Sequence, residues 1–256
     1  MKLSQVAVQL YTLRNFLKTP AEIAQSLHKV REIGYEAVQI SGMGPIDEQE
    51  LVEILDAEGL VCCATHEPGV EILNNPEKVI ERLNRLDCQY TAYPFPADVK
   101  MDSREDVEVF ADALNRAGKV LTEAGKVLTY HNHAIEFRRF GSQTMLEIIF
   151  ERTDPRYIQA EIDTYWVQAG GANPVKWCSS LQDRLPLLHI KDYAISEENK
   201  PTFAEIGYGN LPFHDIVAAA DKAGCRWYIV EQDVCPGDPF DSLAKSFEYI
   251  KGNLVV

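Results

Sequence analysis

The sequence predicts an α/β protein whose fold is a single (β/α)8 TIM barrel over residues 1–256. Short apolar runs alternate with amphipathic stretches from end to end, and strands joined by helical crossovers are parallel. Eight such units fit into 256 residues, a normal length for a closed barrel. The alternative, an open doubly wound sheet, should carry a glycine-rich loop after its first strand, but residues 11–15 contain no glycine.

The predicted strands are short runs of β-branched or apolar residues. Pro94 and Pro96 end the fourth of them, because proline cannot continue the ladder of hydrogen bonds. The strands are expected at residues 6–10, 37–40, 60–65, 88–93, 126–131, 157–163, 185–190 and 227–231.

The predicted helices are recognised by their starts and by their apolar period. Pro20, Pro76 and Pro174 each follow a Thr or Asn, the pattern of a capping residue with proline at the first helical position. The helices are expected at residues 20–34, 47–58, 76–86, 102–125, 144–152, from 174 onward, 214–223 and 239–251. The one long irregular stretch, residues 192–212, follows the seventh strand and is expected to serve the active site.

The composition narrows the function classes. A net charge of -14 argues against nucleic acid or an anionic membrane as partner, since both require a basic surface. The six cysteines form no C-x-x-C pair and are interpreted as reduced thiols. With no apolar run of about 18 residues and no apolar signal segment at the start, the chain is expected to be cytoplasmic. A homo-oligomer is left open.

Polar side chains gather where the fifth and sixth strands end. His131 and His133 share one face of the fifth strand, and Glu136 follows within the same segment. On the sixth strand, Glu161 and Asp163 share a face. An ionised carboxylate inside a barrel is costly unless it is paired or bound to a metal ion. These residues therefore predict a site rather than ordinary packing.

The other strand ends add further polar groups. The seventh strand ends in His189, followed by Lys191 and Asp192, and the eighth ends in Glu231. A closed barrel brings these ends to one mouth, where catalytic groups of such barrels lie. Carboxylates with imidazole predict one divalent cation, Mn²⁺, Mg²⁺, Co²⁺ or Zn²⁺. Substrate contacts are expected from the strand-end residues Gln9, His66, Trp166 and Asp192.

Several motifs of the chain resemble those of the xylose isomerase-like TIM barrel superfamily. This superfamily of sugar isomerases and epimerases includes members similar to inosose dehydratases and members that process 3-keto-glycosides. The motifs are residues 9–14 (QLYTLR), 131–137 (HNHAIEF), 161–164 (EIDT), 189–192 (HIKD), 207–209 (GYG) and 231–233 (EQD). In this order they span the whole chain.

The resemblance implies one divalent cation held by a Glu, an Asp, a His and a Glu. Carried onto this chain, the ligands are Glu136, Asp163, His189 and Glu231. Ketose 3-epimerases carry the first Glu directly at the end of the fifth strand, where this chain has His131. Relatives similar to inosose dehydratases have two histidines there and a Glu a few residues later, as here. Trp166 stands where the epimerase pattern has a histidine, which weakens that assignment.

Three functions follow, with a small sugar or cyclitol as the ligand in each. The first is a metal-dependent isomerase or epimerase that acts on a keto-sugar through an enediolate. Glu231 is its expected base, with His131, His133 and Lys191 as further catalytic groups. The second is a lyase or dehydratase that acts on an inosose or a 3-keto-glycoside and expels a leaving group. The third is a non-catalytic sugar-binding barrel, which would hold no metal.

Overall fold

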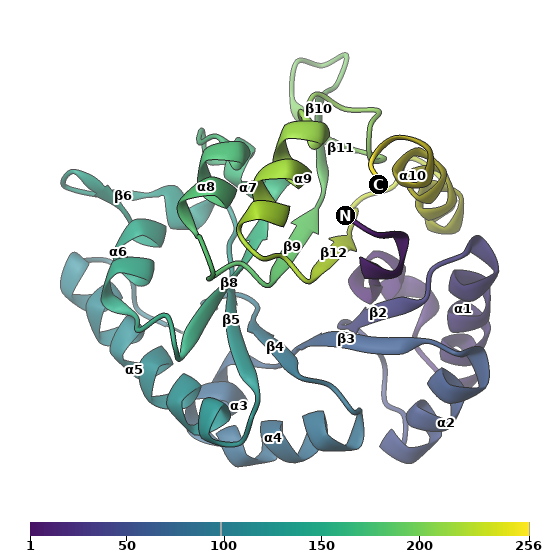
Figure 1. Ribbon diagram of the computed structural model, residues 1–256, viewed down its shortest axis with the longest axis horizontal. Helices are drawn as coiled ribbons and strands as arrows, with labels where there is room; N and C mark the ends of the chain where they lie inside the picture. The colour runs from purple at the N-terminus through teal and green to yellow at the C-terminus, as the bar shows by residue number, and fades with distance from the viewer. Residues whose placement is uncertain (98, 256) are drawn as a thin grey trace.

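The computed structural model describes residues 1–97 and 99–255, and it confirms the predicted barrel (Figure 1). Eight parallel strands close on themselves in the order β1-β12-β9-β8-β5-β4-β3-β2. Their bounds are β1 Val6–Gln9, β2 Ala37–Ile40, β3 Val61–His66, β4 Tyr90–Tyr93, β5 Val127–His131, β8 Ile158–Asp163, β9 Leu187–Ile190 and β12 Trp227–Val230.

A ring of helices covers the outside of the barrel (Figure 1). Proline stands at the first helical position of α1, α4, α8 and α10. Of the three predicted caps, Thr19 and Asn173 accept a backbone hydrogen bond as expected. The side chain of Asn75 does not cap α4, because it donates to Glu71 instead. The α-helices are α1 Pro20–Ile33, α2 Glu48–Glu58, α3 Gly69–Asn74, α4 Pro76–Arg85, α5 Arg104–Glu123, α6 Met145–Arg152, α7 Thr164–Ala169, α8 Pro174–Ser180, α9 Phe213–Lys222 and α10 Pro239–Asn253. Short 3-10 segments occupy Leu3–Gln5, Leu10–Phe16 and Ile135–Phe137.

The structure differs from the predicted elements mainly after β8 and β9. Helix α7 starts directly after β8, because the carboxylate of Asp163 caps it by accepting from the backbone N–H of Trp166. The stretch expected to be irregular contains an antiparallel hairpin, β10 Asp192–Ile195 with β11 Pro201–Ala204. A second small hairpin pairs β6 Arg139–Phe140 with β7 Gln143–Thr144.

The interior of the barrel changes character along its axis. The part of the interior farther from the carboxyl ends of the strands is filled by small or apolar side chains, including Ala7, Ala37, Leu187 and Ile229. The larger apolar core lies between the outward faces of the strands and the helices. Burial of this surface is the main driving force of folding. The part of the interior near the carboxyl ends of the strands is polar, and it forms the base of the site described below.

Two further expectations can be compared with the structure. Within the described residues, no helix has both the length and the apolar character needed to cross a bilayer. All six cysteines are free thiols, and five of them are buried. Burial raises the pKa of Cys178 to about 12, so this thiol is uncharged at neutral pH.

Candidate active site at the barrel mouth

A pocket of about 430 Å³ opens at the carboxyl ends of the barrel strands, a volume within the usual range for small-molecule sites. A cavity of about 620 Å³ lies on the outside of the barrel along α6 and α8, but none of the histidines lines it. The mouth pocket is lined by Tyr11, Arg14, Ser41, His66, Pro94, Phe95, His131, His133, Trp166, Lys191, Glu231, Asp233 and Val234.

Four side chains at the base of this pocket could hold a metal ion together. One ligand atom from each lies within 4.8 Å of the others, and all four residues are buried: His131, Asp163, His189 and Glu231. Strand register brings them together, because His131 is level with Glu161 on the next strand and Asp163 is level with His189.

The spacing of these atoms fits a single divalent cation. Oδ2 of Asp163 lies 3.9 Å from Nε2 of His131 and 3.9 Å from Nδ1 of His189, which is 2.8 Å from Oε2 of Glu231. Two atoms that each bind one cation at about 2.0–2.3 Å can be at most about 4.6 Å apart. In addition, Oδ2 of Asp163 is buried and makes no hydrogen bond of good geometry among the described residues, although the ammonium of Lys191 lies 2.9 Å from it. The donor set therefore suits a divalent cation.

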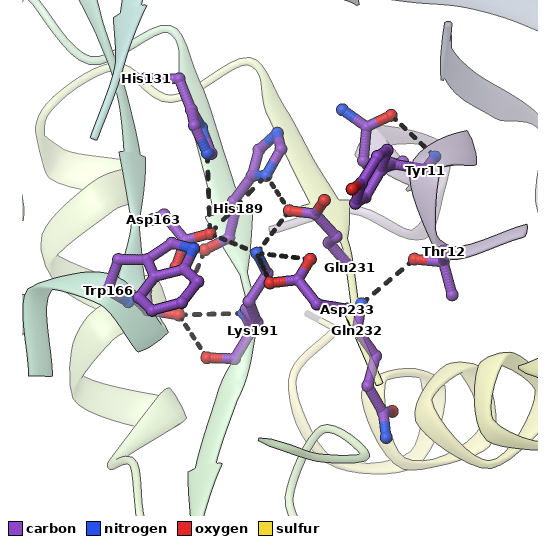
Figure 2. A network of polar contacts seen from close by, with 12 residues as sticks. Tyr11, Thr12, His131, Asp163, Trp166, His189, Lys191, Glu231, Gln232 and Asp233 are labelled. Atoms are coloured by element: carbon purple, nitrogen blue, oxygen red, sulfur yellow. Dashed lines mark hydrogen bonds and ion pairs between the residues drawn. The ribbon is translucent and has the colours of Figure 1, made fainter. Parts of the chain in front are cut away.

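Lys191 supplies the positive charge that now faces these carboxylates (Figure 2). Its Nζ lies 2.7 Å from Oε2 of Glu231, 2.9 Å from Oδ2 of Asp163 and 3.3 Å from the carboxylate of Asp233. Although burial opposes its charge, these three carboxylates raise the pKa of Lys191. The lysine is therefore a fixed cation at the base of the pocket.

Two imidazoles in the pocket are uncharged at neutral pH. Burial and the charge of Lys191 together lower the pKa of His133 to about 3. Burial and His189 together lower the pKa of His131 well below its usual range. Nδ1 of His133 is also buried and lacks a hydrogen-bond partner in the described part of the chain. Both rings can therefore accept a hydrogen bond from a bound ligand.

A network of polar side chains lies beneath the cation cluster. Oε1 of Glu161 is 2.5 Å from Nε2 of His66, and its Oε2 accepts from Nε2 of Gln39 at 2.8 Å. Gln39 in turn contacts Nε2 of His189 through Oε1 at 2.6 Å and accepts from Nε2 of Gln9 at 2.9 Å. Buried polar groups need such partners, because an unpaired one costs about 1–3 kcal/mol.

The carboxylates of the site differ in charge state. Burial alone would raise the pKa of Glu231, but Lys191 and His189 lower it well below its usual range. Burial and the neighbouring Glu231 raise the pKa of Asp233 to about 6. Against the effect of burial, Glu161 and Glu231 raise the pKa of His189 to about 10. In the cation-free protein, His189 therefore carries a charge at neutral pH.

Glu136 lies outside the cluster in which the resemblance placed it. Its carboxylate accepts hydrogen bonds from the hydroxyl of Tyr130 at 2.9 Å and from the backbone N–H of His133 at 2.8 Å. Both oxygens are thus engaged on the outward side of β5, since Tyr130 points away from the barrel interior. His131 takes the fourth place in the group of ligand atoms. Glu136 instead fixes the turn that presents His133.

Asp192 and Gln9, expected to contact substrate, do not line the pocket. The fully buried carboxylate of Asp192 accepts from the backbone N–H groups of Tyr193, Gly207, Gly209 and Leu211, so it ties the connection between β9 and α9 together. Gln9 lies deeper, where its side chain contacts Gln39 and caps the segment after β1. His66 and Trp166 do line the pocket, as expected.

For some residues of the site, the sequence analysis predicted no role. Glu161 was noticeable only as a second carboxylate on the face of Asp163, and Gln39 only as an amide in an apolar strand. Tyr11 and Arg14 line the pocket from the 3-10 segment after β1. The guanidinium of Arg14 donates to the backbone carbonyl of Asp233 at 2.8 Å. A link between residues so distant in sequence requires the closed barrel.

The fold and the site define a (β/α)8 barrel with a carboxylate–imidazole cluster at its catalytic face. A model of the family described as "Xylose isomerase-like TIM barrel" matches residues 27–252. The chain belongs to this family.

The relatives agree with this assignment. An inosose dehydratase of Geobacillus thermodenitrificans is 29% identical over 168 residues, which cover 58% of this chain and 55% of that protein. The chain thus spans about half the length of the curated relatives it matches. A solved sugar phosphate isomerase/epimerase of Parabacteroides distasonis superposes with a TM-score of 0.84 at 23% identity, over 98% of this chain and 94% of that one. An L-ribulose 3-epimerase superposes with a TM-score of 0.75 at 17% identity, over 99% and 95%. At these identities the structural likenesses show the fold alone.

Proposed function

We propose that the chain is a divalent-cation-dependent isomerase or epimerase of a keto-sugar or keto-cyclitol, which moves a proton at the carbon next to the carbonyl group. One observation carries the proposal. A cluster with the donor set and spacing for one cation lies in the same pocket as the uncharged imidazole of His133, which is not one of the cluster's ligands. Cation ligands beside an unprotonated base are the groups that this reaction needs.

The proposed cation ligands are Asp163, His189 and Glu231, with His131 in place of Glu136. A bound Mn²⁺, Mg²⁺, Co²⁺ or Zn²⁺ would act as a Lewis acid toward the carbonyl oxygen of the substrate. His189 suits this role because Nε2 faces Oε1 of Gln39, which leaves Nδ1 directed at the two carboxylates. A metal-binding histidine commonly donates its other ring N–H in this way.

The remaining pocket residues have distinct proposed roles. His133 lines the pocket and has a buried nitrogen without a hydrogen-bond partner in the described chain, which supports it as the group that accepts the substrate proton. Glu231, expected from the sequence as the base, is paired with Lys191 and His189, which supports a ligand role instead. Lys191 would stabilise negative charge that develops on the substrate oxygen. Nε1 of Trp166 is buried without a hydrogen-bond partner in the described chain, so it can donate to a sugar hydroxyl.

Dehydration is the second candidate, and the curated relatives named inosose dehydratase favour it. It shares the first proton abstraction and then expels a hydroxyl group from the neighbouring carbon. A leaving hydroxyl requires a proton donor, and the pocket presents the carboxyl group of Asp233, whose pKa is raised to about 6 by burial and Glu231. The two candidates differ only in the fate of the same intermediate.

Solvent-exchange experiments test the proposal. The purified protein, loaded with Mn²⁺ or stripped with a chelator, is incubated in heavy water with an inosose, a 3-keto-glucoside and several ketohexoses. We expect deuterium next to the carbonyl of one substrate, only in the cation-loaded protein, together with an isomer or epimer visible by NMR. A new enone absorbance would instead identify a dehydratase. Bound cation without exchange into any of these substrates would contradict the proposal, and binding of sugars by a protein that takes up no cation would leave the non-catalytic sugar-binding barrel.

A further inference from the structure

Glu161 stands at the centre of three histidines, below the proposed cation ligands. Its Oε1 lies 2.5 Å from Nε2 of His66, 3.1 Å from Nδ1 of His131 and 3.1 Å from Nε2 of His189. The side chain is fully buried, and so is that of His189. One oxygen atom therefore faces one nitrogen of each ring.

The nitrogens that face Glu161 must carry protons. A carboxylate oxygen that meets the lone pair of an unprotonated ring nitrogen at about 3 Å in a buried site would be repelled by it. The contact with His131 is bent, so it falls short of a full hydrogen bond, but the electrostatic preference is the same. For His189, Oε1 of Gln39 adds a second acceptor at 2.6 Å on the same side.

The opposite nitrogens of two of these rings point at the cation cluster. Nε2 of His131 and Nδ1 of His189 are both 3.9 Å from Oδ2 of Asp163. If Nδ1 of His131 holds its proton, Nε2 is left with the lone pair that a cation needs. For His189, the contacts of Nε2 with Glu161 and Gln39 orient the ring so that Nδ1 is the nitrogen that faces the cluster. One carboxylate thus sets the usable donor atom of both rings, although they offer different nitrogens.

A second cation held by Glu161 and the three histidines is the competing interpretation, since these four residues also form a possible ligand group. The distances disfavour it. Two ligands of one cation at about 2.0–2.1 Å in tetrahedral or octahedral geometry lie roughly 2.9 Å or more apart. Oε1 of Glu161 and Nε2 of His66 are 2.5 Å apart, a spacing that requires a shared proton.

We propose that Glu161 is a positioning residue that fixes the ring tautomer of His131 and orients the ring of His189, and thereby prepares both for cation binding. The inference rests on the cation site of the proposed function. Carboxylates that orient metal-binding histidines in this way typically contribute about 10–100-fold to metal affinity. The residue would act without touching cation or substrate.

Two readouts test the role of Glu161, in the full chain and in the variants E161Q and E161A. Two-bond ¹H–¹⁵N spectra of ¹⁵N-histidine-labelled protein without cation report which nitrogen carries the proton, with the His131 signals assigned from His131→Gln. Wild-type protein should show His131 protonated at Nδ1, and both variants should lose this fixed state. Titration with Co²⁺, followed by its visible absorbance, should give an affinity about 10–100-fold weaker in the variants.

Gln159→Ala is the matched control, because Gln159 lies two residues earlier on β8 and lines a cavity at the other end of the barrel. Circular dichroism confirms that each variant is folded, and E161Q keeps the side-chain volume if E161A is unstable. His131 protonated at Nε2 in the wild type, or unchanged Co²⁺ affinity in folded E161Q, would overturn the inference. Two Co²⁺ ions per wild-type chain and one in E161A would overturn it in favour of a second cation site. If the wild type binds no Co²⁺, the proposed function fails, while the spectra still decide the role of Glu161.

Discussion

The ammonium nitrogen of Lys191 lies 2.7 Å from Oε2 of Glu231 and 2.9 Å from Oδ2 of Asp163. A single lysine thus holds together two carboxylates that we assign to a divalent cation. Lysine and cation must therefore share the same pair of negative charges, and this competition can be measured.

Lys191→Met should destabilise the cation-free protein, because breaking a buried ion pair leaves its charges uncompensated, at a typical cost of about 3–5 kcal/mol. Saturating Mn²⁺ should restore more stability to the variant than it adds to the wild type. Thermal unfolding with and without Mn²⁺ measures both effects. Lys200→Met, which removes an exposed ion pair with Glu198, is the control and should change little. A cation-free Lys191→Met protein as stable as the wild type would contradict the assigned pairing.

Asp163→Ala and Glu231→Ala should each remove bound cation while leaving the barrel folded. Each change deletes one proposed ligand and leaves the apolar core between strands and helices intact. We expect cation affinity to fall by more than about 100-fold, since ligand loss should exceed the effect of an outer carboxylate. Elemental analysis of the dialysed protein measures the bound cation, and circular dichroism checks that the barrel is folded. Asp112→Ala, which breaks an exposed pair with Arg152, is the control. Full metal content in either test variant would refute the ligand set.

His133→Gln should separate proton transfer from cation binding. Loss of a general base typically lowers the rate by about 10²–10⁴-fold, while the four proposed ligands remain in place. The measurement is the rate of deuterium exchange into substrate, together with the metal content of the same sample. His214→Gln, a change of an exposed histidine on α9, should leave both unaltered. Exchange at the wild-type rate in His133→Gln would assign the proton transfer to another residue.

Asp192→Asn should loosen the connection between β9 and α9. The carboxylate accepts four backbone hydrogen bonds, and the amide that replaces it brings an NH₂ group toward some of the same N–H donors. We expect a loss of about 2–4 kcal/mol in unfolding free energy. Chemical denaturation measures this loss, and limited proteolysis should locate new cleavage within residues 193–211. A loss of substrate affinity without any loss of stability would contradict this anchoring role and favour the substrate contact that the sequence predicted.

The sequence predicted the barrel well because each element carries its own local signal. Caps such as Thr19 before α1 and the apolar period of α5 depend only on neighbouring residues. The hairpin β10–β11 was missed because residues 192–212 contain glycine and proline without clear alternation. It forms where the carboxylate of Asp192 accepts hydrogen bonds from the backbone N–H groups of Gly207 and Leu211, which lie many residues later in the chain.

The site was predictable only where strand ends carry their own ligands. Asp163, His189 and Glu231 follow apolar runs, so parallel strands place them at one mouth without further information. Glu136 could not be located in this way, because its position depends on the turn after β5 and on the hydroxyl of Tyr130. The role of Glu161 depends on His66, which comes from a strand across the barrel, and no local pattern encodes such a pairing.

Gln39 on β2 and Glu161 on β8 belong to strands that stand four places apart in either direction around the eight-stranded ring. Their 2.8 Å contact is therefore a strut across the full diameter of the barrel. Because this hydrogen bond joins opposite strands, it restrains changes in the width of the barrel at the base of the pocket. Movements that admit a substrate or release a product are then expected in the segments beyond the strand ends, among them the protruding hairpin β10–β11 (Figure 1).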